Sequence, residues 1–129
     1  MSKAKKILLV DDDKEFVEST KEVVSAEGYE VHVAYDGASG VALAKKVKPD
    51  LMILDVMMAT DTEGFDVSRD IPKIPELKKM PVIMMTGIRE KMHLAYKFEP
   101  DDAWLPVKAV LEKPVPPERL LEEIRKALG

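Results

Sequence analysis

Five short runs of mostly apolar residues recur along the chain. Each run is shorter than a core helix, and most of them lack the regular alternation of polar and apolar residues seen in half-exposed strands. This pattern is typical of strands that are covered on both faces, as in a parallel sheet. The sequence therefore predicts five strands, at Ile7–Val10, Val31–Tyr35, Leu51–Leu54, Val82–Met85 and Val107–Leu111.

Amphipathic segments separate most of these runs. The first has Val23 and Val24 at the centre of its apolar face, and Gly28 stands where a glycine commonly ends a helix. Asp36 can cap a second helix that runs to about Val47, with Pro49 beyond its end. The face expected for the first helix comprises Phe16, Thr20, Val23, Val24 and Glu27.

A strongly amphipathic segment closes the chain. We expect a helix to open there at Pro116–Pro117, because proline suits the first turn of a helix. Glu122 and Lys126 form a favourable i,i+4 pair on this helix. Its apolar stripe comprises Leu120, Leu121, Ile124, Ala127 and Leu128.

The two remaining connections carry weaker helix signals. A helix that starts after Gly64 should end early, because Pro72 and Pro75 follow it. A fourth helix is expected at Ile88–Phe98, and an irregular loop through Pro106 should come after it.

Strands and helices therefore alternate five times. This alternation predicts an α/β fold in which a five-stranded parallel sheet, joined by right-handed crossovers, carries helices on both faces. The length of 129 residues suits one domain, over residues 1–129. In such sheets the ligand site lies beyond the carboxyl ends of the strands. Polar residues should therefore cluster at those ends.

Polar residues do follow four of the five predicted strands. Asp11, Asp12 and Asp13 follow the first strand, and Asp55 follows the third. Thr86 follows the fourth strand, and Lys113 comes shortly after the fifth. Asp13 is expected to cap the first helix, because a carboxylate is favourable at a helix N-terminus.

Carboxylates gathered this closely repel one another. Two unit charges about 4 Å apart cost about 1 kcal/mol in water and about 4 kcal/mol at an effective dielectric near 20. A hard cation is therefore expected between Asp11, Asp12 and Asp55, and oxygen ligands without histidine or cysteine favour Mg²⁺.

Charge and composition exclude other classes of function. The net charge is −4 and no long basic cluster occurs, which argues against nucleic acid as the main partner. The chain has no cysteine, so disulfides and thiolate metal sites are excluded. The apolar run after the amino-terminal lysines is too short for a signal peptide or a membrane span, so we expect a cytoplasmic protein without membrane insertion.

Four short motifs, in this order, resemble those of the response-regulator receiver domain. They are Ile7 to Asp13 (ILLVDDD), Asp55 to Met58 (DVMM), Thr86–Gly87 and Lys113–Pro114. The resemblance covers the whole chain and implies a flavodoxin-like receiver fold with the strand order 2-1-3-4-5. No output domain fits after Gly129, so a stand-alone receiver is expected.

The resemblance implies a function in two-component signalling. Asp55 would accept a phosphoryl group from a sensor histidine kinase or a histidine phosphotransfer protein. The phosphorylated protein would then dock on a downstream protein target that the sequence does not name. Such a domain is not an enzyme, although it assists its own phosphotransfer and dephosphorylation.

The family's functional residues carry over one by one. Asp11 and Asp12 match the acidic pair that binds Mg²⁺ together with Asp55, and the backbone carbonyl of Met57 matches a further protein ligand. Thr86 matches the switch hydroxyl. Lys113 matches the lysine that pairs with the phosphate, and the Lys113–Pro114 peptide is expected to be cis.

The chain departs from the family pattern in its readout region. Ala59 stands where proline is usual, and the loop from Asp55 to Gly64 is one residue longer. Val110 stands in place of the switch aromatic, and the segment from Thr86 to Lys113 is several residues longer than usual. We therefore expect the signal to be read through residues 87–106 instead.

Two other functions fit parts of the sequence. Asp11–Asp12–Asp13 also satisfies the D-x-D signature of haloacid-dehalogenase phosphatases, but the order of the remaining motifs is wrong for them. A receiver-like binding module that signals without phosphate is the other alternative, and the complete acidic set argues against it.

Overall fold

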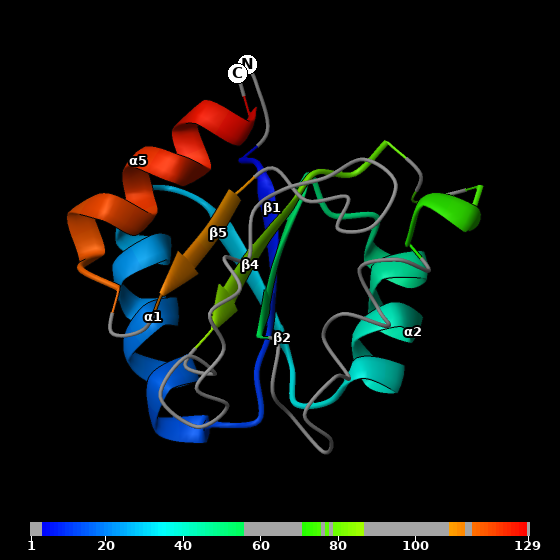
Figure 1. Ribbon diagram of the computed structural model, residues 1–129, viewed down its shortest axis with the longest axis horizontal. Helices are drawn as coiled ribbons and strands as arrows, with labels where there is room; N and C mark the ends of the chain where they lie inside the picture. The colour runs from blue at the N-terminus through cyan, green and yellow to red at the C-terminus, as the bar shows by residue number, and fades with distance from the viewer. Residues whose placement is uncertain are drawn as a thin grey trace, which may run out of the picture.

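The computed structural model describes residues 4–55, 71–75, 77, 79–86, 109–112 and 115–128. Its centre is a five-stranded sheet in which every pair of neighbouring strands is parallel (Figure 1). The strand order is β2-β1-β3-β4-β5. The strands are β1 (Lys6–Val10), β2 (Glu30–Ala34), β3 (Leu51–Asp55), β4 (Val82–Thr86) and β5 (Ala109–Glu112).

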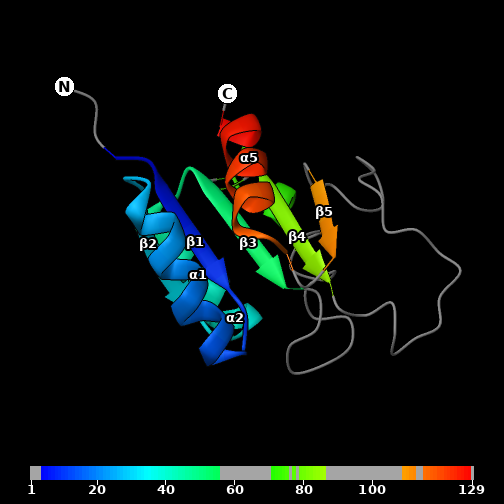
Figure 2. The same ribbon diagram turned by 90° about the vertical axis from the view of Figure 1, so that its left-hand side faces the viewer.

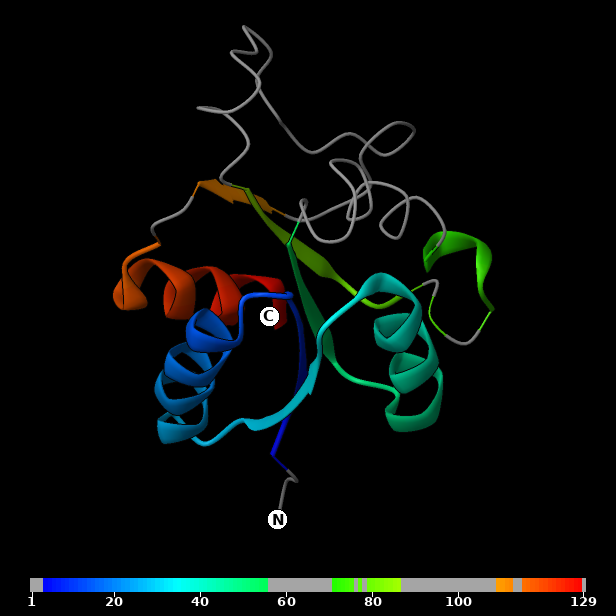
Figure 3. The same ribbon diagram turned by 90° about the horizontal axis from the view of Figure 1, so that it is seen from below.

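Helices cover both faces of this sheet. Figure 3 shows α1 (Lys14–Ala26) and α5 (Pro117–Leu128) on one face and α2 (Gly37–Val47) on the other. A short 3₁₀ helix, η1 (Ile71–Lys73), follows β3 in the described part of the chain. The α/β fold expected from the sequence is confirmed, and so is the strand order.

The alternating side chains of β1 show why its sequence is apolar from Ile7 to Val10. Ile7 and Leu9 belong to the hydrophobic cluster beneath α1 and α5. Leu8 and Val10 belong to the cluster beneath α2. All four are at most 1% exposed. Because both faces of the strand are buried, neither set of alternate positions is free to be polar.

The predicted strands agree with the observed strands to within two residues at each described end. β1, β3 and β4 each extend one residue beyond the predicted run, and the extensions of β3 and β4 are Asp55 and Thr86. β2 begins at Glu30 and ends at Ala34, so Tyr35 lies outside the strand. For β5, residues 107 and 108 lie outside the described part of the chain, which resumes at Ala109.

The predicted face of α1 is partly wrong. Thr20 and Val24 are buried as expected, but so is Val17, which the prediction omitted. Glu27 is exposed, because the helix ends at Ala26 and Glu27 is its C-cap. Gly28 follows with a φ of 94°, a left-handed conformation that glycine adopts without steric cost.

The predicted start of α2 is confirmed at its cap. Asp36 Oδ1 accepts a hydrogen bond of 2.7 Å from the backbone N–H of Ser39, and Asp36 Oδ2 accepts one of 3.1 Å from the Ser39 hydroxyl. The backbone bond, and then the hydroxyl bond, lower the pKa of the Asp36 carboxyl below its ordinary value. At its other end the helix stops before Lys48, which has a φ of 54°, and Pro49 follows.

The predicted start of α5 at Pro117 is also confirmed. Leu120 and Ile124 of its stripe are buried, and Leu121, Ala127 and Leu128 pack against the same cluster. Lys126 Nζ lies 3.2 Å from Glu122 Oε1, as the i,i+4 spacing predicted. The helices expected after Gly64 and at Ile88–Phe98 fall mostly or wholly outside the described residues. Among the described helices, none combines the length and the apolar character that a membrane span requires.

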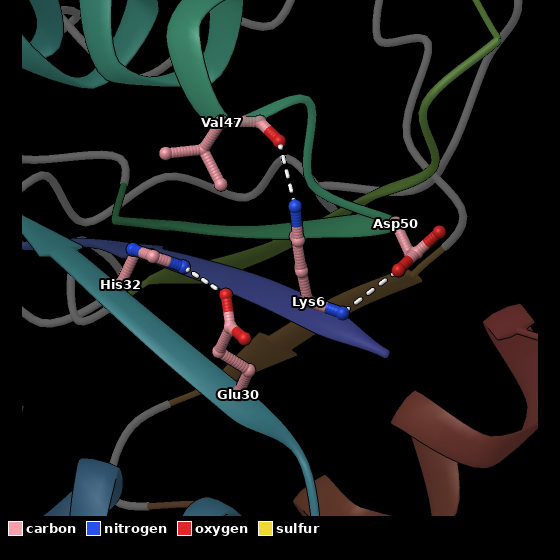
Figure 4. A network of polar contacts seen from close by, with 5 residues as sticks. All are labelled: Lys6, Glu30, His32, Val47 and Asp50. Atoms are coloured by element: carbon pink, nitrogen blue, oxygen red, sulfur yellow. Dashed lines mark hydrogen bonds and ion pairs between the residues drawn. The ribbon is translucent and has the colours of Figure 1, made fainter. Parts of the chain in front are cut away.

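A set of hydrogen bonds ties the amino end of the sheet together (Figure 4). The backbone N–H of Lys6 donates to Asp50 Oδ2 at 2.7 Å, and the N–H of Asp50 donates back to the Lys6 carbonyl at 2.8 Å. Lys6 Nζ donates to the carbonyl of Val47, the last residue of α2, at 3.4 Å. The starts of β1 and β3 and the end of α2 are therefore joined at one place.

We expect Asp50→Ala to lower the free energy of unfolding by about 1 kcal/mol, because the partly buried N–H of Lys6 loses its acceptor. Asp50→Asn keeps an acceptor oxygen in the same place and should lose less. Urea unfolding of both variants measures the difference. Equal losses would show that the negative charge of Asp50, rather than its hydrogen bond, stabilises this end.

Candidate functional site

The carboxyl ends of the parallel strands meet at one edge of the sheet. Figure 2 shows the arrowheads of β1, β3, β4 and β5 pointing to the same side. Val10 of β1 is paired with Leu54 of β3, so the residues that follow them, Asp11 and Asp55, lie next to each other. Register alone therefore brings together two carboxylates that are 44 positions apart in the sequence.

Asp12 completes an acidic cluster at this edge. Carboxylate oxygens of Asp11, Asp12 and Asp55 all lie within 4.8 Å of one another. Asp11 is 0% and Asp55 is 4% exposed, whereas Asp12 is exposed to solvent. The cluster thus consists of two buried carboxylates and one that is exposed to solvent.

Hydrogen bonds at the start of α1 fix Asp11 in this cluster. The N–H of Asp11 donates to the Ala34 carbonyl at 3.1 Å, and the N–H of Asp13 donates to Asp11 Oδ1 at 2.9 Å. Asp13 Oδ1 in turn accepts a bond of 3.1 Å from the N–H of Phe16 and caps α1, as predicted. Asp13 therefore links the start of the helix to the orientation of Asp11.

Three carboxylates in this space suit a hard divalent cation. At about 4.8 Å each pair of charges repels by about 1 kcal/mol in water and by about 3 kcal/mol at an effective dielectric near 20. Oxygen donors without nitrogen or sulfur ligands match the preference of Mg²⁺, which keeps part of its water shell and suits a site with one open side. The residues of the cluster therefore fit a site for such an ion.

The other predicted site residues are placed only in part. Thr86 is the last residue of β4, the strand that pairs with β3, so its backbone lies at the same edge as Asp55. Val110 lies in β5, opposite Met84. Lys113 and Met57 lie outside the described residues.

Two backbone groups that hold the acidic cluster were not among the residues predicted from the sequence. The carbonyl of Ala34 and the N–H of Asp13 orient Asp11, and neither has a side-chain signature. The capping signal at Asp13 was the available clue, because a helix that begins directly after a strand brings its first N–H groups close to the strand's last carboxylates.

Comparison of the sequence with models of protein families shows to which family the chain belongs. The family model of the response regulator receiver domain matches residues 7–125. The chain belongs to the response-regulator receiver family. It is therefore a receiver domain of two-component signalling, and the haloacid-dehalogenase phosphatase considered from the D-x-D signature is not the family to which it belongs.

Solved receiver structures match nearly the whole chain. The receiver domain protein (CheY-like) of Methanospirillum hungatei JF-1 is 31% identical, with a TM-score of 0.77 over 97% of this chain and 94% of that one. The chemotaxis response regulator CheY4 of Vibrio cholerae is 30% identical, with a TM-score of 0.79 over 97% and 99%. A putative response regulator of Chloroflexus aurantiacus J-10-fl is 26% identical, with a TM-score of 0.80 over 98% of both chains.

We expect Asp12→Asn to weaken Mg²⁺ binding by this receiver at least about tenfold, because one of three clustered charges is lost. Glu15→Gln is the matched control, since it removes one exposed charge from the first turn of α1 outside the cluster. Titration of both variants with MgCl₂ by calorimetry measures the affinities. Equal weakening would mean that the general negative charge attracts the ion and that Asp12 is not a ligand.

Proposed function

We propose that this receiver accepts a phosphoryl group on Asp55 in a Mg²⁺-dependent transfer from a phosphohistidine donor. The supporting observation is the position of Asp55, a buried carboxylate at the end of β3 within 4.8 Å of the Asp11 and Asp12 carboxylates. A buried carboxylate beside two others is costly unless a cation and an incoming group use it. Membership of the receiver family supports the same reaction class.

In the proposed transfer, a carboxylate oxygen of Asp55 attacks phosphorus as the bond from phosphorus to the donor imidazole breaks. The product is an acyl phosphate on Asp55, and the imidazole leaves. The parallel register of β1 and β3 supports this role, because it holds Asp55 in place beside Asp11 without a flexible linker. Such positioning is most of what a protein contributes to phosphoryl transfer.

The proposed metal ligands are Asp11, Asp12, Asp55 and the backbone carbonyl of Met57. A bound Mg²⁺ would supply positive charge to the phosphoryl oxygens. Asp11 is suited to hold it, because hydrogen bonds from its own surroundings already fix its backbone and one of its carboxylate oxygens. The exposed Asp12 leaves the acidic cluster open to the donor.

Lys113 and Thr86 are proposed to respond to the new phosphoryl group. Three carboxylates, one Mg²⁺ and the Lys113 ammonium sum to zero formal charge, and phosphorylation adds about one negative charge. That charge would be matched by Lys113 and by the Thr86 hydroxyl. The end of β4 beside β3 supports this role for Thr86.

The proposed partners are proteins. The donor is a sensor histidine kinase or a histidine phosphotransfer protein, and the phosphorylated receiver docks on a downstream protein. The net charge of −4 supports a protein target rather than nucleic acid.

Acetyl phosphate with Mg²⁺ should add one phosphoryl group to the protein, as seen by intact mass, and Asp55→Asn should abolish the addition. Asp50→Asn is the matched control, because Asp50 directly precedes β3 and Asp55 ends it. This control should be labelled like the native protein. A phosphoryl group that persists in Asp55→Asn would reject the assignment, and an unlabelled native protein would favour the phosphate-independent binding module.

The readout prediction concerns residues that lie outside the described part of the chain. Val110 has no aromatic ring to couple to Thr86, so we expect residues 87–106 to change most on activation. Amide exchange with and without beryllofluoride measures this change. Protection confined to residues 55–64 would show that the prediction is wrong.

A further inference from the structure

Among the strands that the structure describes, β2 forms one edge of the sheet and is paired with β1 alone (Figure 3). Its first N–H, of Glu30, donates to the Lys5 carbonyl at 2.9 Å, and its last carbonyl, of Ala34, accepts from Asp11. Because backbone groups alternate in direction along a strand, the N–H and C=O groups of Val31 and Val33 face away from β1. Two outward donor and acceptor pairs are therefore available for another strand.

A groove with a volume of about 510 Å³ lies between the end of β2 and one face of α2. On the strand side it is lined by Val33 and Tyr35, and on the helix side by Ser39, Ala42, Leu43 and Lys46. Tyr35 is 39% exposed and is the one large exposed hydrophobic residue in the part of the chain that the structure describes. The groove thus offers an apolar floor directly beside the open strand edge.

The charges around this groove favour an acidic occupant. Lys46 lines it, and Lys14 Nζ lies 5.8 Å from the centre of the Tyr35 ring. Neither lysine forms an ion pair with any residue that the structure describes. The one carboxylate in the lining, Asp36, already accepts hydrogen bonds from Ser39 on both oxygens. The ammonium groups of Lys46 and Lys14 can therefore pair with carboxylates of a ligand in the groove.

We propose that this edge and groove bind an extended, acidic peptide segment of a partner protein, which adds a sixth strand beside β2. The backbone of the segment would pair with Val31 and Val33, an apolar side chain would enter the groove, and carboxylates would meet Lys46 and Lys14. Strand addition obtains affinity from the backbone and selectivity from such a pocket. This inference goes beyond the phosphotransfer proposed above and does not depend on it.

A second copy of the chain suits this edge less well. Two β2 strands paired antiparallel would form one continuous sheet and bring both α2 helices to the same face. The two helices would run antiparallel, so the last turn of each, with Lys45 and Lys46, would lie toward the first turn of the other, which contains no acidic residue. An acidic partner segment supplies the carboxylates that a second α2 lacks there.

Binding can be tested with two synthetic hexapeptides, Val-Val-Glu-Glu-Val-Val and Val-Val-Lys-Lys-Val-Val, each of which places both an apolar and a charged side chain on either face of an added strand. We expect the acidic peptide to slow amide exchange at Val31 and Val33 in the full chain and the basic peptide to have no effect. Lys46→Glu should weaken binding of the acidic peptide about tenfold. Lys45→Glu makes the same charge change one residue away, outside the groove lining, and should alter binding less than about twofold.

Three results would overturn the proposal. The first is no protection of Val31 and Val33 at about millimolar acidic peptide, the weak limit of specific recognition. The second is equal weakening by Lys46→Glu and Lys45→Glu, which would indicate general charge attraction. The third is sedimentation as a dimer that Val33→Pro abolishes, because the edge would then belong to a second copy. Val33→Pro removes an outward N–H and leaves the inward ones of β2 in place.

Discussion

The burial of β1 and β3 on both faces is the constraint on which the rest of the structure depends. Residues 7–10 and 51–54 are at most 1% exposed, so a shift in the pairing of the two strands would disrupt packing against helices on both sides. Register is strongly specified under such conditions. Because the register is fixed, so is the distance between the two strand ends, where Asp11 and Asp55 lie. The hydrophobic core therefore determines the distance between the two buried carboxylates of the acidic cluster.

This arrangement places the repulsion between carboxylates at the ends of the two strands whose positions are most strongly fixed by packing. Two of the three clustered carboxylates are almost fully buried, and neither can move outward without breaking the strand pairing. The first turn of α1 offsets part of the cost, because its N–H groups and its dipole favour negative charge. In the proposed function, the remainder is relieved by Mg²⁺. The residues proposed for phosphorylation chemistry are thus among those that the fold holds most firmly.

The sequence predicted the sheet well because its signal is local. The apolar runs that end before Asp11, Asp55 and Thr86 predict three strands and the edge of the sheet at which the site lies. All three residues lie at that edge. The prediction of a buried helix face was wrong where the helix ends. Glu27 was placed on that face, but it is the C-cap of α1 and is exposed. The hydrogen bond to the Ala34 carbonyl and the backbone groups of β2 that face outward could not be predicted, because backbone direction depends on the partner strand. The motif predicted that Asp12 belongs to the acidic cluster, but it did not predict that Asp12 is exposed to solvent.

The tie between Lys6, Asp50 and Val47 has a mechanical consequence for the sheet. It joins the amino ends of β1 and β3 to the end of α2, while the opposite ends of these strands carry the clustered carboxylates. The two strands are therefore held by hydrogen bonds at one end and carry negative charge at the other. In the proposed function, a change of charge at Asp11 and Asp55 would therefore act on strands whose other ends are already held in place.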